Sequence, residues 1–306
     1  MSVRYLDPKN DLVFKKVFSR PRLLKSFLNA LLPLKEPVET LEYLPVELVP
    51  DLPELKHSVV DVRCVDRVGR QFIVEMQMFW TTGFKSRVLF NASKAFVRQA
   101  DRAAGYAELQ PVFSLNLVNQ IFERNTPEYY HHYAIVELEQ THRRIEGLEF
   151  VFVELPKFRP EDLASDRMRK LWLRFLTETG GEAAVAAPEL LEEPATREAL
   201  ECVAESGFSR AELDAYDRYW DSIRCEVTLV DGSFNKGLRE GELKGKLEGK
   251  LEGKLEGKLE GKLEGKLEGK LERKLEMAAA LKKAGLLSDE QIAAASGLAV
   301  EQVLAL

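Results

Sequence analysis

Polar side chains that could do chemistry fall on two short segments, residues 59–65 and 71–79, whose alternating apolar pattern predicts strands. Pairing the two segments antiparallel places Asp61 opposite Glu75, with Gln77 on the same face. Cross-strand neighbours have Cβ atoms only about 5 Å apart, so two carboxylates there repel each other unless a cation lies between them. A hard divalent ion such as Mg²⁺ prefers carboxylate oxygens. The pair could therefore hold a metal ion.

The same spacing allows a simpler interpretation, in which a solvent-exposed polar face carries Arg63 beside the two acids and neutralises them. The proposed register pairs Arg63 with Ile73 and Val65 with Gln71, and a shift of one residue would move every side chain to the other face. The opposite face collects apolar side chains suited to a core, namely Val60, Val62, Cys64, Phe72, Val74, Met76 and Met78. The spacing alone leaves both interpretations open.

A helical pattern over residues 86–103 follows the second strand and aligns polar side chains on one face. These side chains are Arg87, Asn91, Lys94, Arg98 and Arg102, and Lys85 extends the row. Such a row could follow DNA phosphates, although an ordinary solvated helix face has the same pattern. Because no aromatic residues interleave with these charges, stacking of single-stranded bases is not expected.

Several motifs occur in an order that resembles one family. They are LDPKNDLVFKKVF at residues 6–18, Asp61, Glu75-Met76-Gln77, ELPKF at residues 154–158, and a Gly-Lys-Leu-Glu repeat. This series resembles the Rpn family of recombination-promoting nucleases, also called putative transposases, in the PD-(D/E)XK nuclease superfamily. The resemblance covers residues 3–275.

The resemblance implies an α/β fold with a PD-(D/E)XK restriction-endonuclease-like core, in which helices flank a mixed central sheet. It also implies a divalent-metal-dependent DNA endonuclease linked to recombination or transposase-like activity. Asp61 and Glu75 would bind Mg²⁺ or another divalent cation, Gln77 would take the position usually held by Lys, and Asp11 would be the acid of the first helix. Asp11 could also be the N-cap of a helix that begins at Leu12.

Gln77 leaves an alternative function open, because an amide carries no charge and more of the electrostatic work would fall on the metal. The alternative is a catalytically weak or inactive DNA-binding or assembly protein that uses the same basic face and the repeat arm.

Composition divides the chain into four predicted parts. Residues 1–160 form the nuclease-like domain, residues 161–235 a helical region, residues 236–276 the low-complexity repeat spacer, and residues 277–306 a small helical C-terminal segment. The first part holds 22 basic and 20 acidic residues (+2), the second 8 and 17 (−9), and the last two together 14 and 13 (+1), which sum to the net charge of −6. The acidity therefore belongs to the helical region and does not exclude DNA as the partner of the first domain.

The repeat contains nine of the chain's 19 glycines, spaced every four residues from Gly237 to Gly269. A step of four residues advances about 400° on a helix, so the leucine stripe winds by about 40° per repeat. Each Gly also costs roughly 0.8–1.0 kcal/mol relative to Ala. We expect a spacer of marginal helical stability, or an arm for homo-oligomerisation, followed by three short helices at residues 277–283, 288–295 and 300–306.

No apolar run is long enough to cross a bilayer. The three cysteines, Cys64, Cys202 and Cys225, lack metal-binding or disulfide spacing. We therefore expect a cytoplasmic protein with no membrane partner.

Overall fold

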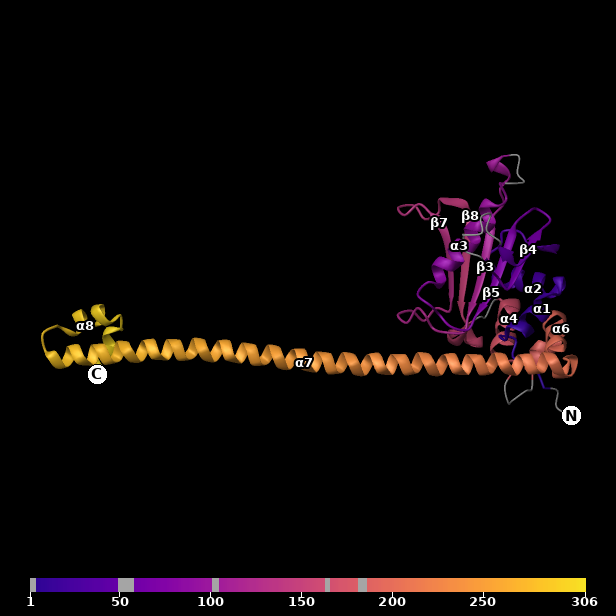
Figure 1. Ribbon diagram of the computed structural model, residues 1–306. Helices are drawn as coiled ribbons and strands as arrows, with labels where there is room; N and C mark the ends of the chain where they lie inside the picture. Colours follow the sequence, from indigo (N-terminus) through magenta and orange to yellow (C-terminus); the bar gives the residue numbers. More distant parts are fainter. Residues whose placement is uncertain (1–3, 49–57, 101–104, 163–165, 181–185) are drawn as a thin grey trace. The chain divides into compact units, whose positions relative to one another are not determined.

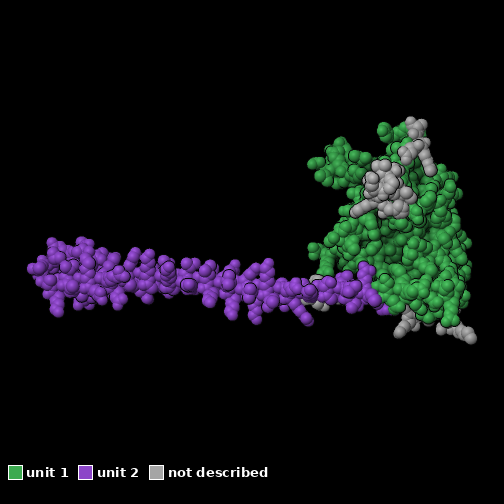
Figure 2. All heavy atoms as spheres, in the orientation of Figure 1, with its two compact units in different colours: residues 1–223 green, residues 224–306 purple. Residues whose placement is uncertain are grey.

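The computed structural model describes residues 4–48, 58–100, 105–162, 166–180 and 186–306 (Figure 1). The chain divides into two units, residues 1–223 and residues 224–306 (Figure 2). The first unit contains the sheet and its flanking helices, and the second contains C-terminal helices. The four-part division by composition remains a prediction.

Six strands of the described residues form one mixed sheet in the order β1-β4-β5-β6-β8-β7. Their bounds are β1 (Leu41–Tyr43), β4 (Val62–Asp66), β5 (Gln71–Gln77), β6 (Val112–Val118), β7 (Tyr130–Val136) and β8 (Arg144–Glu154). Strands β5, β6 and β8 run parallel at the centre, and β1, β4 and β7 extend the sheet with antiparallel pairs. A separate small ladder joins β2 (Glu47–Leu48) to β3 (Ser58–Val59). The predicted α/β class with a mixed sheet flanked by helices is confirmed.

The β4–β5 hairpin has the register expected from the sequence. Both expected pairs, Arg63–Ile73 and Val65–Gln71, are present in the ladder. The hairpin turn is closed by the Asp66 carboxylate, which accepts backbone N–H groups from the turn, and Gly69 there has φ +92°, a conformation that favours glycine. The ladder ends one residue short of Asp61, so the backbone of Asp61 is free to leave the sheet plane.

Helices α1 (Asp11–Phe18), α2 (Pro21–Leu31), α4 (Arg167–Glu178) and α6 (Pro194–Val203) pack on one face of the sheet and share its main apolar core. The rings of Phe18, Phe27 and Trp172 meet there, with Phe27 at 4.4 Å from Phe18 and 5.3 Å from Trp172 between ring centroids. From the sheet, the predicted apolar hairpin face contributes Cys64 and Phe72, which are both fully buried. We call this the core face.

Helix α3 (Phe84–Val97) packs against the opposite face, over β6 and β8 (Figure 1). We call this the α3 face. Its apolar clusters are smaller, and buried polar side chains interrupt them. The helix was expected over residues 86–103; it ends at Val97, with Arg98 as its C-cap.

Shorter elements connect these layers. They are α5 (Pro188–Glu192) and the 3₁₀ turns η1 (Tyr106–Glu108), η2 (Leu155–Lys157), η3 (Pro160–Asp162) and η4 (Glu205–Gly207).

The long helix α7 (Arg210–Ala284) has 75 residues and includes the whole repeat. The repeat leucines between Leu247 and Leu271 are 46–73% exposed, as a stripe that winds around a single helix requires. The expected separate helix at residues 277–283 is wrong: these residues continue α7, because Met, Ala, Leu and Lys are all good helix formers and no breaker precedes them. Whether the repeat stays helical in solution remains a prediction.

The C-terminal helices α8 (Asp289–Ser296) and α9 (Val300–Leu304) pack on the end of α7 through a small cluster that includes Ala278, Ile292 and Val303. Ser288 forms a capping box with Gln291, and Gly297 ends α8 with φ +66°. Across the described ranges, we find no helix with the length and apolar character that a membrane span requires.

Candidate metal and phosphodiester site

Asp61 lies between β3 and β4, where the chain approaches the neighbouring strand β5. Its Oδ2 accepts the backbone N–H of Met76 at 2.7 Å. Because Met76 follows Glu75 directly, this hydrogen bond holds the Asp61 carboxylate beside Glu75. The structure thus brings together the two acids that the hairpin register placed opposite each other.

Glu75 is buried on the α3 face, with 6% of its surface exposed. Its Oε1 accepts from Asn91 Nδ2 at 3.2 Å, and its Oε2 lies 3.5 Å from Arg87 Nη2. The expectation of a solvent-exposed polar face neutralised by Arg63 is therefore wrong. Arg63 is itself buried and donates to Gln71 Oε1, while α3 supplies the guanidinium beside Glu75.

The two carboxylates resist ionising together. Burial and the neighbouring charge of Asp61 raise the pKa of Glu75 to about 7, although Arg87 and Asn91 act in the opposite direction. Burial also raises the pKa of Asp61, against the hydrogen bond from Met76. A bound cation would relieve this repulsion.

Gln77 lies two residues beyond Glu75 on β5. Its Oε1 accepts from Arg87 Nη2 at 2.7 Å, so one guanidinium contacts both Glu75 and Gln77. Gln77, which the resemblance places where a Lys is usual, therefore has a fixed positive charge next to it, provided by helix α3. The sequence placed Arg87 on a basic helix face but gave no sign of this contact.

Asp11 is not the N-cap of α1. That role belongs to Asn10, whose side chain accepts the N–H groups of Leu12 and Val13 at 3.0 and 3.3 Å. Asp11 stands in the first turn and forms an ion pair with Lys15 at 2.7 Å. The charges of both residues act on the pKa of Asp61, Asp11 raising it and Lys15 lowering it. Besides Arg87, Lys15 is thus a second cation that acts on the site, and the sequence analysis did not identify it.

The donor set suits a hard divalent cation. Among the described residues no group of three His, Cys, Asp or Glu side chains is arranged to hold a metal ion. Mg²⁺, however, is commonly bound by one or two carboxylates together with water and substrate phosphates. Asp61 and Glu75 fit that requirement, and they are the residues that would hold the ion.

The expected basic row on α3 divides into buried and exposed members. The placement of Asn91 on an exposed face is wrong, because it is 1% exposed and bonds Glu75. The Arg87 side chain is about half exposed, and Lys85 is similarly exposed while paired with Glu123. The Lys94 ammonium donates to the carbonyl of Leu48. Arg98 is the C-cap of α3, and Arg102 lies outside the described residues.

The motif at residues 154–158 stabilises the chain near the site. Glu154 is fully buried and accepts from His131 Nε2 at 2.8 Å, from Lys157 Nζ at 2.7 Å and from the backbone N–H groups of Phe122 and Glu123. Burial by itself would raise the pKa of Glu154, but these hydrogen bonds outweigh it and lower the pKa. The hydrogen bonds from the Phe122 and Glu123 N–H groups hold the segment between β6 and β7 against the end of β8.

A mixed sheet flanked by helices, with an Asp directly before β4 brought beside a Glu-x-Gln motif on the adjacent strand β5, defines a PD-(D/E)XK core. A family model described as PD-(D/E)XK nuclease family transposase matches residues 8–226. The match spans most of the chain, and the chain belongs to this family. No curated protein and no solved structure matches the sequence.

Proposed function

We propose that the protein is a divalent-metal-dependent DNA endonuclease that hydrolyses phosphodiester bonds, with a role in DNA recombination or transposition. The observation that carries the proposal is the buried carboxylate of Glu75 beside the half-buried carboxylate of Asp61, with the half-exposed guanidinium of Arg87 at 3.5 Å from Glu75. Nuclease family membership supports the reaction class.

In this proposal Asp61 and Glu75 hold Mg²⁺ or another divalent ion. When bound, such an ion polarises the phosphate and lowers the pKa of water. Asn91 and the Met76 N–H keep the two carboxylates oriented. Asp11, whose charge acts on Asp61, adds to the negative potential that attracts the ion.

Two further side chains would act on the substrate. The Gln77 amide orients the attacking water, and its Oε1 is held by Arg87. Arg87 supplies a fixed positive charge that stabilises the developing charge on the phosphate. Arg98 and Lys94 would add to the attraction of the DNA backbone, whereas the charge of Lys85 is balanced by Glu123.

The test is nicking of supercoiled plasmid by the full-length protein in Mg²⁺, in Mn²⁺ and in EDTA. Cleavage should require the metal and should fall by at least about 10³-fold in Asp61→Asn and in Glu75→Gln, as for loss of a group that acts directly on the reaction. Glu146→Gln is the matched control, because Glu146 is an exposed acid of β8 paired with Lys35. Circular dichroism of each variant checks folding.

Nicking that persists unchanged in both site variants would overturn the proposal. DNA binding without cleavage under any of the metals would instead support the alternative of a catalytically inactive DNA-binding or assembly protein, with Arg87 occupying the space beside Glu75. A gel-shift measurement on the same samples separates these outcomes.

A further inference from the structure

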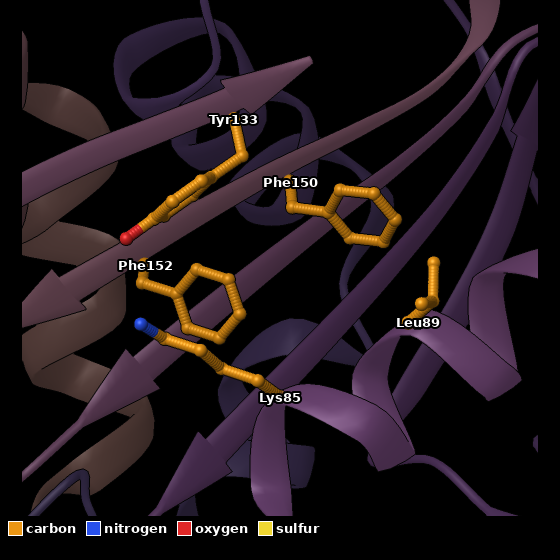
Figure 3. Close-up of a pocket in the computed structure, with 5 residues that line it drawn as sticks. All are labelled: Lys85, Leu89, Tyr133, Phe150 and Phe152. Carbon is orange, nitrogen blue, oxygen red and sulfur yellow. The ribbon is translucent and has the colours of Figure 1, made fainter. Parts of the chain in front are cut away.

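A small aromatic cavity opens on the α3 face, on the β7 side of the proposed metal site. Its volume is about 170 Å³, and it is lined by Tyr133, Phe150, Phe152, Lys85 and Leu89. Figure 3 shows the three rings standing on β7 and β8, with Lys85 and Leu89 reaching toward them from α3. The lining is almost wholly apolar, and the cavity has no part in the proposed metal chemistry.

The rings around the cavity are held in place by one another. Phe152 is 4% exposed and meets Tyr133 edge-on, with ring centroids 5.7 Å apart. Behind it, Trp80 and Phe122 stack at 4.0 Å and also contact Phe152. Tyr133, by contrast, is 41% exposed. The cavity therefore has a rigid floor and one aromatic wall open to solvent, which is the arrangement that a planar ring can enter and stack against.

The charge at the cavity mouth is already balanced. The Lys85 ammonium donates to Glu123 at 2.9 Å and lies 5.3–5.6 Å from the ring centroids of Trp80, Phe122 and Tyr133. The Glu123 carboxylate would repel a phosphate there, whereas it would not repel a neutral ring. The cavity volume of about 170 Å³ also favours a single ring, since pockets for drug-sized ligands enclose about 300–1,000 Å³.

Strand register connects the cavity to the metal site. Glu75 pairs with Asn116 on β6, and Asn116 pairs with Phe152 on β8, so the three side chains form one row across the α3 face. Two strand spacings, about 10 Å, separate Glu75 from Phe152. Arg87, which contacts Glu75 and Gln77, provides positive charge at the metal site.

We propose that this cavity binds a single unpaired nucleobase of the DNA strand whose phosphates lie along Arg87 and the metal site. Aromatic rings bind bases without sequence preference, because every base has a π-face. The proposal rests on DNA being the substrate and adds that DNA with an unstacked base is preferred. The row of basic residues on α3 did not predict this, because the rings come from β7 and β8.

The experiment compares two labelled duplexes of the same sequence, one fully paired and one with a single unpaired thymine. Binding of the full-length protein is measured by fluorescence anisotropy in EDTA, so that no cleavage occurs. The wild-type protein should prefer the duplex with the unpaired base by roughly 5- to 100-fold, the range for one base–aromatic stack.

Three variants test whether Tyr133 carries the preference. Tyr133→Ala should lose it, while Tyr133→Phe should keep it, because stacking needs the ring and not the hydroxyl. Tyr106→Ala is the matched control and should also keep it, since Tyr106 is 88% exposed and does not line the cavity. Light scattering of Tyr133→Ala should give the same mass as wild type.

Equal affinity of the wild-type protein for both duplexes would overturn the proposal, as would a preference that survives Tyr133→Ala. A lower mass for Tyr133→Ala would also overturn it and would identify the cavity as an interface between copies of the chain. These outcomes are distinct from failure of the nuclease proposal, which is measured in the plasmid assay as absent cleavage or as nicking that is unchanged in the two site variants.

Discussion

The two faces of the sheet are built from the same strands but have opposite character. On the core face, Phe27, Phe72 and Trp172 are fully buried in a continuous apolar cluster shared by α1, α2, α4 and α6. On the α3 face, Glu75 and Asn91 are almost equally buried, and they form a polar network instead. Burial alone therefore does not distinguish the structural face from the functional one; the chemistry of what is buried does.

The difference has an energetic consequence. Apolar burial stabilises the fold by about 25 cal/mol per Å², while a buried carboxylate whose pKa is raised lowers stability whenever it is ionised. We expect substitutions on the core face to lower the free energy of unfolding and substitutions of the two acids to raise it while abolishing cleavage. Four predictions test this contrast.

The largest effect is expected on the core face. Phe27→Ala should lower the free energy of unfolding by about 3–5 kcal/mol, because it removes a ring between Phe18 and Trp172 and leaves a cavity. Leu89→Ala, on the exposed side of α3, should change it by less than about 1 kcal/mol. Urea denaturation measures both; equal losses would contradict the contrast between the faces.

Next in size is a gain of stability on the α3 face. The pKa of Glu75, about 7 in the folded protein against an ordinary 4.5, makes its ionised form unfavourable in the fold. Glu75→Gln should therefore raise the free energy of unfolding at pH 8 by up to about 3 kcal/mol in metal-free buffer.

The size of this gain in the free energy of unfolding depends on pH. The penalty is fully present above pH 7, declines as the pH falls from 7 to 4.5 and vanishes below 4.5, where the folded and unfolded chains both carry a neutral carboxyl. Denaturation of wild type and Glu75→Gln at pH 8 and pH 5 should thus give a gain that shrinks at the lower pH. A gain of the same size at both values would show that charge is not its cause.

Removal of the Arg87 guanidinium tests the role of the α3 face in DNA cleavage. Arg87→Met should reduce metal-supported plasmid nicking by about 10- to 100-fold, which corresponds to roughly 1.4–2.7 kcal/mol of transition-state stabilisation. Arg87→Lys should retain part of the rate. Arg143→Met is the matched control, because Arg143 is an exposed arginine paired with Glu137. Unchanged nicking in Arg87→Met would remove Arg87 from the proposed mechanism.

The smallest effect on stability is expected at Asp11. Its ion pair with Lys15 is about half exposed, and such pairs contribute about 0.3–0.5 kcal/mol. Asp11→Asn should therefore leave the denaturation midpoint almost unchanged but slow nicking several-fold, since its charge acts on Asp61. A large loss of stability with normal nicking would assign Asp11 a purely structural role.

Local pattern was enough for much of the fold. Alternating apolar residues located β4 and β5, and the hairpin register followed from the turn closed by Asp66 and Gly69. The 3.6-residue period located α3, although not its C-terminal end. These features depend on contacts within a few residues or on one repeated period, which a sequence displays directly.

Boundaries and caps were harder to predict, because neighbouring residues of similar type compete. Asn10 and Asp11 are both good N-caps, and the choice of Asn10 follows from its burial under α1. The C-terminal end of α7 shows the same limit: residues 277–283 have helical propensity whether they start a new helix or continue the old one, and only the absence of a helix breaker before them favours continuation.

By itself, the sequence determined which residues could do chemistry and that Asp61 and Glu75 would lie opposite each other, because the register of a hairpin is fixed by its turn and its alternation. Only the tertiary structure decided what surrounds them. α3 brings Arg87 and Asn91 onto Glu75, and β7 and β8 bring Tyr133 and Phe152 next to Lys85. Those contacts join residues from different elements. They are set by the packing of a whole layer on the sheet, which no local period encodes.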